Sequence, residues 1–364
     1  MARFGKYTFV IYLLSALAAL ELIALAAVLG ADPAVPAAAA AETAAVPEQM
    51  PAWLEPAPRR EEPPEEKKLP EEKEPPPGER TAAEILEEQQ IIAHGMGAIA
   101  GRATLNCLEG FQAQYEKGVR VFEVDLRLTA DQQVVLRHDW RAGWQAGVSE
   151  TSVPTLEQFL DKPLLGRFTP LSFQDLLKLM EQYPDICVVT DTKFTDAEIV
   201  KLQFEAMVRD GAELGLSYLF DRMIIQVYDQ LMFRVVDSVR HFDYYIYTLY
   251  TDGFARTEAD FREKADFCAE NGVMGITMWD YWWQEDYASI AREKGLKVFA
   301  HTVNAPEQAL ALLAEGVSAV YTDELTPGDL TEEPETGAEN QASAEEGEKD
   351  HGADGKDTIQ REDL

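Results

Sequence analysis

Short β-rich runs alternate with helical runs through most of this chain. Runs rich in Val, Ile and aromatic residues predict eight strands, at Ile91–His94, Val121–Arg127, Ile186–Thr190, Met223–Val227, Tyr244–Leu249, Val273–Met278, Leu296–Thr302 and Val317–Tyr321. Helical runs separate them, at Leu108–Lys117, Ser172–Gln182, Asp196–Leu214, Glu258–Asn271, Tyr287–Lys294 and Pro306–Glu315. Eight strands alternating with helices over about 240 residues favour a (β/α)8 barrel, the TIM barrel.

The second predicted strand has a charged face. Glu123 and Asp125 alternate with apolar residues, so their side chains point the same way. A further run, Val134–His138, follows after a connection too short for a parallel crossover, and it must return antiparallel. This extra β-hairpin pairs Asp125 with about Arg137 and brings His138 level with the two carboxylates. A charged hairpin exposed to solvent is the alternative interpretation.

Ligands bind to a TIM barrel where its strands end, so polar residues at strand ends are candidate site residues. Glu123, Asp125 and Asp191 lie at the ends of the second and third strands. Because they offer only oxygen ligands, we predict that they bind one divalent cation, Mg²⁺ or Ca²⁺. Lys193 faces the same way as Asp191, and we expect it to contact a phosphate beside the cation.

Two histidines complete the predicted site. His94 ends the first strand, and His138 returns on the hairpin. One histidine could take a proton from a nucleophile while the other returns a proton to a leaving oxygen. These residue types together predict phosphodiester cleavage. Tyr228 and Trp279 also end strands, and we expect both to contact the substrate.

At these residues the chain resembles the glycerophosphodiester phosphodiesterases, within the phospholipase-C-like phosphodiesterases. The resemblance covers residues 88–326 and rests on the segments IIAHGMG, FEVDLRLTADQQVVLRHD, TDTK and NAPEQALALLAEGVSAVYTDEL. It implies metal ligation by the three carboxylates and acid–base catalysis by the two histidines. It also implies a phosphate contact for Lys193 and a substrate contact for Asn106.

Some positions depart from the family's pattern. Gly95 stands where the family has arginine, and Leu105 stands where it has glutamate. Asp191 replaces a glutamate with a shorter ligand. His301 stands where the family's Trp-Thr-Val-Asn has its tryptophan, and we interpret it as a structural substitute. These departures leave the reaction class intact and leave the substrate open.

Three functions follow from these features. The first is metal-dependent hydrolysis of glycerophosphodiesters or of a phospholipid headgroup. The second is a lipase similar to phosphatidylinositol phospholipase C or sphingomyelinase D, for which Trp140–Trp144 or Tyr281–Trp283 could supply an apolar rim. The third is a non-catalytic module that binds phosphates or lipids. A formal net charge of −33 argues against a nucleic-acid partner.

The N-terminal end of the chain predicts attachment to a membrane. An apolar run, Thr8–Leu29, is long enough to span a bilayer. We therefore expect a single-pass protein of the cell membrane with its catalytic domain outside the cytoplasm; secretion after signal cleavage is the alternative. The expected units are an anchor at 1–30, a disordered Ala/Pro/Glu-rich linker at 31–84, the barrel at 85–327 and an acidic disordered tail at 328–364.

Overall fold

The computed structural model describes residues 69–140 and 152–331. In this part of the chain, nine strands form one sheet in the order β1-β9-β8-β7-β6-β5-β4-β2-β3, and β1 also pairs with β2. That last pairing closes the parallel strands into a barrel, and the predicted TIM barrel is confirmed. The strands are β1 (Ile91–Ala93), β2 (Val121–Leu128), β3 (Val134–Leu136), β4 (Cys187–Asp191), β5 (Met223–Val227), β6 (Tyr245–Thr248), β7 (Gly275–Trp279), β8 (Lys297–His301) and β9 (Ala319–Thr322).

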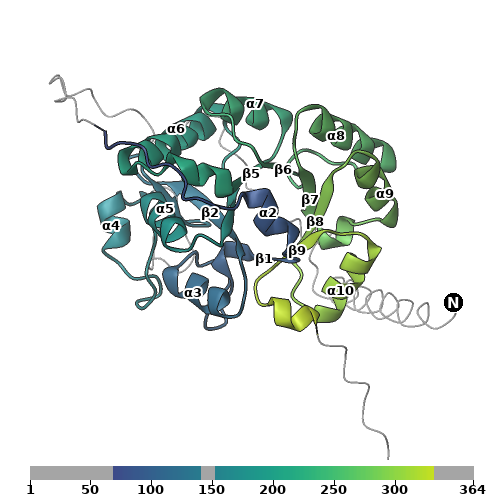
Figure 1. The fold of residues 1–364 in the computed structure, drawn as a ribbon, viewed down its shortest axis with the longest axis horizontal. Coiled ribbons are helices and arrows are strands. Elements are labelled where there is room, and N and C mark those ends of the chain that lie inside the picture. Colours follow the sequence, from purple (N-terminus) through teal and green to yellow (C-terminus); the bar gives the residue numbers. More distant parts are fainter. Residues whose placement is uncertain (1–68, 141–151, 332–364) are drawn as a thin grey trace, which may run out of the picture.

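Helices form a ring around the strands, with α2 across the middle of the view in Figure 1. The predicted N-cap Ser172 is confirmed, since its side chain accepts a hydrogen bond from the Asp175 amide at the start of α5. Helices α2, α4 and α7 were not among the predicted helices. The bounds are α2 (Ala82–Glu87), α3 (Leu108–Glu116), α4 (Leu156–Leu160), α5 (Phe173–Gln182), α6 (Ala197–Leu214), α7 (Gln230–Val239), α8 (Glu258–Glu270), α9 (Glu285–Glu293) and α10 (Pro306–Glu315).

Side chains that point into the barrel form an apolar layer at its N-terminal end. Ile85 and Leu86 of α2 pack against this layer, which includes Val121, Val189, Ile224, Ile246, Phe299 and Tyr321. Residues two positions further along a strand point to the same side. The lumen therefore changes from apolar to polar towards the C-terminal ends of the strands, where Asp191, His301 and Asp323 follow.

The hairpin projecting from β2 has the predicted register. Strand β3 pairs antiparallel with β2, placing Leu126 opposite Leu136. One step further, the Arg137 amide donates a 2.8 Å hydrogen bond to the Asp125 carbonyl. The chain is thereby turned so that His138 returns towards the barrel strands.

The segment before α2 lies against the barrel. The Lys73 amide donates to the Gly215 carbonyl at 2.9 Å, and Arg222 pairs with Glu79 at 2.7 Å. Residues 73–79 therefore contact the barrel, although they precede residue 85, where the sequence placed the start of the domain. The predicted anchor at Thr8–Leu29, the linker before residue 69 and the tail after residue 331 lie outside the described residues. Among the described residues, no helix has the length and apolar character needed to span a membrane.

Candidate active site

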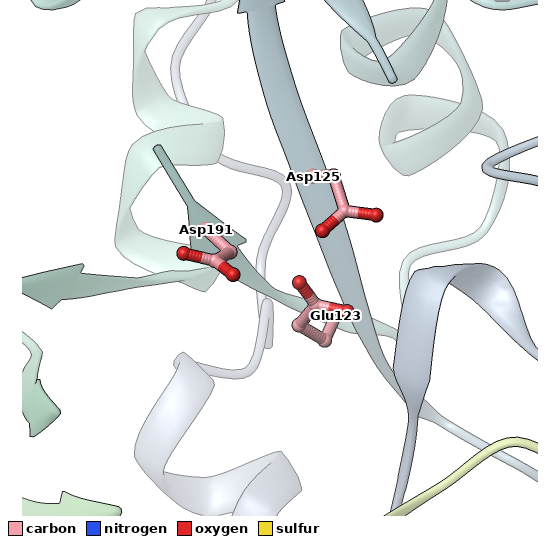
Figure 2. Close-up of side chains that lie close together, drawn as sticks. All are labelled: Glu123, Asp125 and Asp191. Carbon is pink, nitrogen blue, oxygen red and sulfur yellow. The ribbon is translucent and has the colours of Figure 1, made fainter. Parts of the chain in front are cut away.

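Three carboxylates converge where the middle of β2 lies beside the C-terminal end of β4. Glu123, Asp125 and Asp191 each offer an oxygen, and these atoms lie within 4.8 Å of one another. Figure 2 shows the three carboxyl groups close together, with Glu123 and Asp125 along one strand and Asp191 near the end of its neighbour. Asp125 and Asp191 are direct neighbours in the parallel register, which explains their approach. All three residues are buried, and the predicted convergence of this carboxylate cluster is confirmed.

Glu123 is the least satisfied member of the carboxylate cluster. Its Oε2 accepts a 2.6 Å hydrogen bond from the Gly95 amide, whereas its buried Oε1 has no hydrogen-bond partner among the described residues. Burial and the neighbouring Asp125 raise the pKa of Glu123 to about 8. A bound cation would reverse this effect by favouring the ionised carboxylate.

Lys193 places its ammonium between two members of the cluster. Its Nζ lies 2.8 Å from Asp125 Oδ1 and 2.5 Å from Asp191 Oδ2. Although burial opposes the charged form, Asp125 and Asp191 hold the pKa of Lys193 well above its ordinary value. Burial also opposes ionisation of Asp125, but Lys193 and the two histidines lower the pKa of that carboxyl to about 2. One ammonium facing three carboxyl groups leaves an excess of acid.

His94 lies directly after β1, as the first residue of the short helix η2 (His94–Met96). Its Nδ1 is 2.8 Å from Asp323 Oδ1, and the Asn304 amide nitrogen donates to the other oxygen of Asp323 at 2.8 Å. Burial opposes protonation, but Asp323 and Glu123 raise the pKa of His94 to about 9. Asp323, to which the sequence analysis gave no role, is the partner that orients His94.

His138 reaches the carboxylate cluster from the hairpin. Its Nδ1 lies 3.1 Å from Asp139 Oδ2, and nearly half of its side chain is exposed. The charge of His138 helps to lower the pKa of Asp125, as expected for a neighbouring group. The structure therefore brings both predicted histidines to the cluster, His94 with about a quarter of its side chain exposed and His138 with nearly half of its side chain exposed.

The loop after His94 explains why Gly95 replaces the family's arginine. Gly95 has a φ of +53°, and a Cβ built there would lie 2.4 Å from the Cα of Thr104. The positive φ disfavours a side chain at this position, and the backbone of Thr104 leaves no space for a Cβ. Leu105 is buried under the hairpin with Trp140 and Phe159, so it offers nothing to the site.

Asn106 binds Asp125 on two sides. Its side-chain amide donates to Asp125 Oδ2 at 2.6 Å, and its Oδ1 accepts a 2.9 Å hydrogen bond from the Asp125 amide. Asn106 is completely buried. The sequence assigned it a substrate contact; the structure instead commits its side chain to holding a carboxylate in place.

Two tyrosines hold Asp191. The Tyr228 hydroxyl donates to Asp191 Oδ1 and accepts a 3.0 Å hydrogen bond from the Lys193 amide. Tyr250, which sequence reasoning missed, donates to the same carboxylate at 3.2 Å. The missed signal was its position two residues beyond Thr248 at the end of β6, which points it into the lumen. We predicted from the sequence that Tyr228 contacts the substrate; in the structure its hydroxyl contacts Asp191 and Lys193.

The aromatic residues after β7 divide into two groups. Trp279 packs against Tyr250, with ring centroids 5.8 Å apart, and stacks on the exposed Tyr281 at 6.1 Å. We call Tyr250, Trp279 and Tyr281 the aromatic wall. Trp282 packs on Phe254, and Trp283 hydrogen-bonds Glu315. The other predicted rim segment, Trp140–Trp144, has a buried Trp140, and its remaining residues lie outside the described ranges.

Comparisons with known proteins agree on one group. The sequence model of the glycerophosphoryl diester phosphodiesterase family matches residues 98–326. The matched range contains the carboxylate cluster and His138, and it begins after His94. No curated protein matches the chain.

Solved structures share the barrel. An Oleispira antarctica phosphodiesterase in complex with the product sn-glycerol-3-phosphate aligns with a TM-score of 0.54 and 17% identity, covering 67% of this chain and 96% of that one. A glycerophosphodiester phosphodiesterase from Parabacteroides distasonis aligns with a TM-score of 0.52 and 20% identity, covering 64% of this chain and 92% of that one. At these identities, the likeness shows the fold.

Proposed function

The chain belongs to the glycerophosphoryl diester phosphodiesterase family, and we propose that it hydrolyses glycerophosphodiesters with one divalent cation and two acid–base histidines. Membership of this family establishes that the chain is a phosphoric diester hydrolase. The observation that carries the proposal is the buried carboxylate cluster flanked by His94 and His138. The sn-glycerol-3-phosphate bound to the Oleispira antarctica enzyme supports a small glycerophosphodiester as substrate.

The carboxylate cluster fits a hard divalent cation. Its donors are all oxygens, and Glu123 Oε1 is buried without a hydrogen-bond partner in the described part of the chain. Glu123, Asp125 and Asp191 would hold Mg²⁺ or Ca²⁺, and the ion would stabilise negative charge on the phosphate oxygens. Asn106 fixes Asp125, and Tyr250 fixes Asp191, so two of the ligands are already oriented. Lys193 would add a second positive group beside the phosphate.

Asp323 prepares His94 to act as a base. The carboxylate accepts the Nδ1 proton of His94 and leaves Nε2 to exchange a proton with the substrate. A cation at Glu123 and Asp125 would offset the charges of these two carboxylates, which together with Asp323 raise the pKa of His94, and would move that pKa towards the range of a general base. His138, which is more exposed, is positioned to meet the leaving group.

The proposed reaction has two steps. His94 removes the proton from the glycerol hydroxyl beside the phosphate, and that oxygen bonds to phosphorus while the bond to the leaving alcohol breaks. His138 donates a proton to the leaving oxygen. Water then opens the cyclic diester with the two histidine roles exchanged, which gives glycerol phosphate.

Substrate turnover by the full chain tests this proposal. Glycerophosphocholine, glycerophosphoethanolamine and glycerophosphoinositol are supplied with Mg²⁺ or Ca²⁺, and released glycerol phosphate is measured. We expect hydrolysis by the wild type and a loss of at least about 100-fold in Glu123→Gln. Glu109→Gln is the matched control, because Glu109 accepts hydrogen bonds from Thr169, outside the cluster. Failure to hydrolyse any diester, or an active Glu123→Gln variant, contradicts the proposal.

We also propose that the protein acts outside the cytoplasm at the cell membrane, attached by its N-terminal apolar run. The linker before residue 69 would separate the barrel from the bilayer. Alkaline carbonate extraction of membranes should leave the full chain in the pellet and release a variant lacking residues 1–30. Release of the full chain by carbonate argues against the anchor.

A further inference from the structure

His301 ends β8 inside the barrel lumen, next to the carboxylate cluster. It lies two residues beyond Phe299, a member of the apolar lumen layer, and is the register neighbour of Trp279. Its ring centroid is 4.5 Å from that of Trp279 and 5.4 Å from that of Tyr250. Tyr250 in turn donates to Asp191. One side chain therefore separates His301 from the proposed phosphate site.

The buried Nε2 of His301 has no hydrogen-bond partner in the part of the chain that the structure describes. The residue is 9% exposed, and Nε2 makes no hydrogen bond within the described residues. Buried polar atoms are nearly always hydrogen-bonded, so an exception at a site needs an explanation. Burial, His94 and Lys193 lower the pKa of His301 to about 3, and a neutral imidazole nitrogen can donate or accept according to its tautomer. A ligand hydroxyl could satisfy either form.

The aromatic wall leads outward from His301. The Trp279 and Tyr281 rings are nearly parallel, with an angle of 20° between their planes, and Tyr281 is 66% exposed. Flat aromatic faces suit both the C–H face of a ring and a quaternary ammonium ion. The two classes differ at His301, because a trimethylammonium group has no atom that can hydrogen-bond to Nε2. A hydroxyl-bearing ring uses the wall and the nitrogen together.

We propose that His301, Trp279 and Tyr281 form the subsite for the alcohol beyond the phosphate, and that this subsite selects a polyol ring such as a cyclitol over choline. A ring hydroxyl bonds to His301 Nε2, and the ring packs against Trp279. The inference rests on the proposed function, because it takes the carboxylate cluster as the phosphate site. It assigns His301 a specificity role that the sequence did not predict.

Two diesters and three variants test this subsite in the full chain. The wild type is expected to have a kcat/KM for glycerophosphoinositol at least about 10-fold above that for glycerophosphocholine. His301→Phe keeps an aromatic ring, removes the nitrogen and should lower kcat/KM for the inositol diester about 10- to 100-fold. Its kcat/KM for the choline diester should change less than about twofold. His301→Gln retains a hydrogen-bonding group and should keep the preference.

His241→Phe is the matched control, since His241 is exposed and pairs with Asp237 at 2.7 Å on the outer helix α7. It should leave both kcat/KM values unchanged. Equal losses on the two diesters in His301→Phe would show a structural role and overturn the proposal. A wild type that prefers the choline diester would overturn it as well.

Two further measurements separate this inference from the proposed function. Glycerophosphomethanol lacks a ring, so its hydrolysis reports the cluster and the catalytic histidines alone. If the wild type hydrolyses it and shows no preference between inositol and choline, the subsite is wrong and the proposed function stands. If no diester is hydrolysed, both fail. Free inositol, but not choline, should inhibit the wild type competitively, a result that does not depend on any variant folding.

Discussion

Near the N-terminal end of the barrel, Arg222 meets Glu79 at 2.7 Å, whereas at the C-terminal end Lys193 faces three carboxyl groups. Arg222 also donates to the carbonyls of Met180, Tyr183 and Ile186, so its hydrogen-bonding capacity is used by the fold. Both groups of charges are largely shielded from solvent. Unbalanced buried charge is destabilising unless a ligand compensates it. The balanced end therefore serves stability, and the unbalanced end is where an ion and a substrate are needed.

A hollow does not by itself mark the site. A cavity of about 330 Å³ lies near the N-terminal end, lined by residues that include Leu86, Lys297, Phe299 and Gly316. Its lysine is paired with Glu87 at 2.5 Å, so the charges there are matched. In this barrel, the candidate active site is therefore located by an excess of acidic groups and not by the presence of a cavity.

Removal of the divalent cation should have the largest effect and should act at the unbalanced end. Excess chelator is expected to abolish diester hydrolysis and to lower the Tm, because the acidic groups lose their counter-charge. Activity and Tm are measured before and after chelation, and both should return with added Mg²⁺ or Ca²⁺. Unchanged turnover in excess chelator would rule out a metal-dependent reaction.

Loss of either catalytic histidine should have the next-largest effect on activity. His94→Ala and His138→Ala are each expected to lower kcat about 10²- to 10⁴-fold, and the double variant should be little worse because the two act together. In a glycerophosphodiester with p-nitrophenol as its second alcohol, the p-nitrophenolate leaving group needs little protonation. It should therefore rescue His138→Ala and not His94→Ala.

His241→Ala, at an exposed position two residues after α7, controls for the loss of an imidazole. Rescue of His94→Ala instead would exchange the acid and base roles. Near-normal turnover of the natural diester by both single variants would disprove the two-histidine reaction.

A substitution at the balanced end should change the stability of the protein and leave its activity unchanged. Arg222→Met leaves Glu79 without its partner and should lower the free energy of unfolding by about 3–5 kcal/mol. Below the unfolding transition, kcat should match the wild type because the C-terminal ends of the strands are untouched. Urea unfolding and turnover are measured on the same preparation. A stable Arg222→Met with impaired kcat would break the division between the two ends.

The unbalanced end should also make the stability of the protein depend on pH. The pKa of Glu123 is about 8 against an ordinary 4.5, so the folded, ion-free protein retains a proton that the unfolded chain loses. Its stability should therefore fall as pH rises from about 4.5 to 8. His94 acts in the same direction: its contribution is complete below pH 6.5 and is lost as pH rises through about 9.

The affinity for the cation should increase with pH, whereas the stability of the ion-free protein decreases. The ion needs ionised Glu123, so Mg²⁺ affinity should rise by up to about tenfold per pH unit below pH 8. Titration calorimetry at pH 6, 7 and 8 measures it. A pH-independent affinity would mean that Glu123 is already ionised or is not a ligand.

Much of the site was determined by the sequence itself. The two-residue period of a strand places Glu123 and Asp125 on one face, and the ends of neighbouring parallel strands bring Asp191 beside them. The short connection after β2 forces an antiparallel return, which carries His138 back to the same level. These are local rules, so they can be applied without knowing the distances across the barrel.

Only the tertiary structure decided which groups bind one another. Asp323 reaches His94 across 229 positions of sequence, and Tyr250 reaches Asp191 across 59. Asn106 turns onto Asp125 from a backbone with a positive φ, and His301 keeps a nitrogen unpaired within the described residues. A hydrogen bond forms only when the donor–acceptor distance is right to within a few tenths of an ångström. The closure of the barrel sets those distances, and no periodicity in the sequence records them.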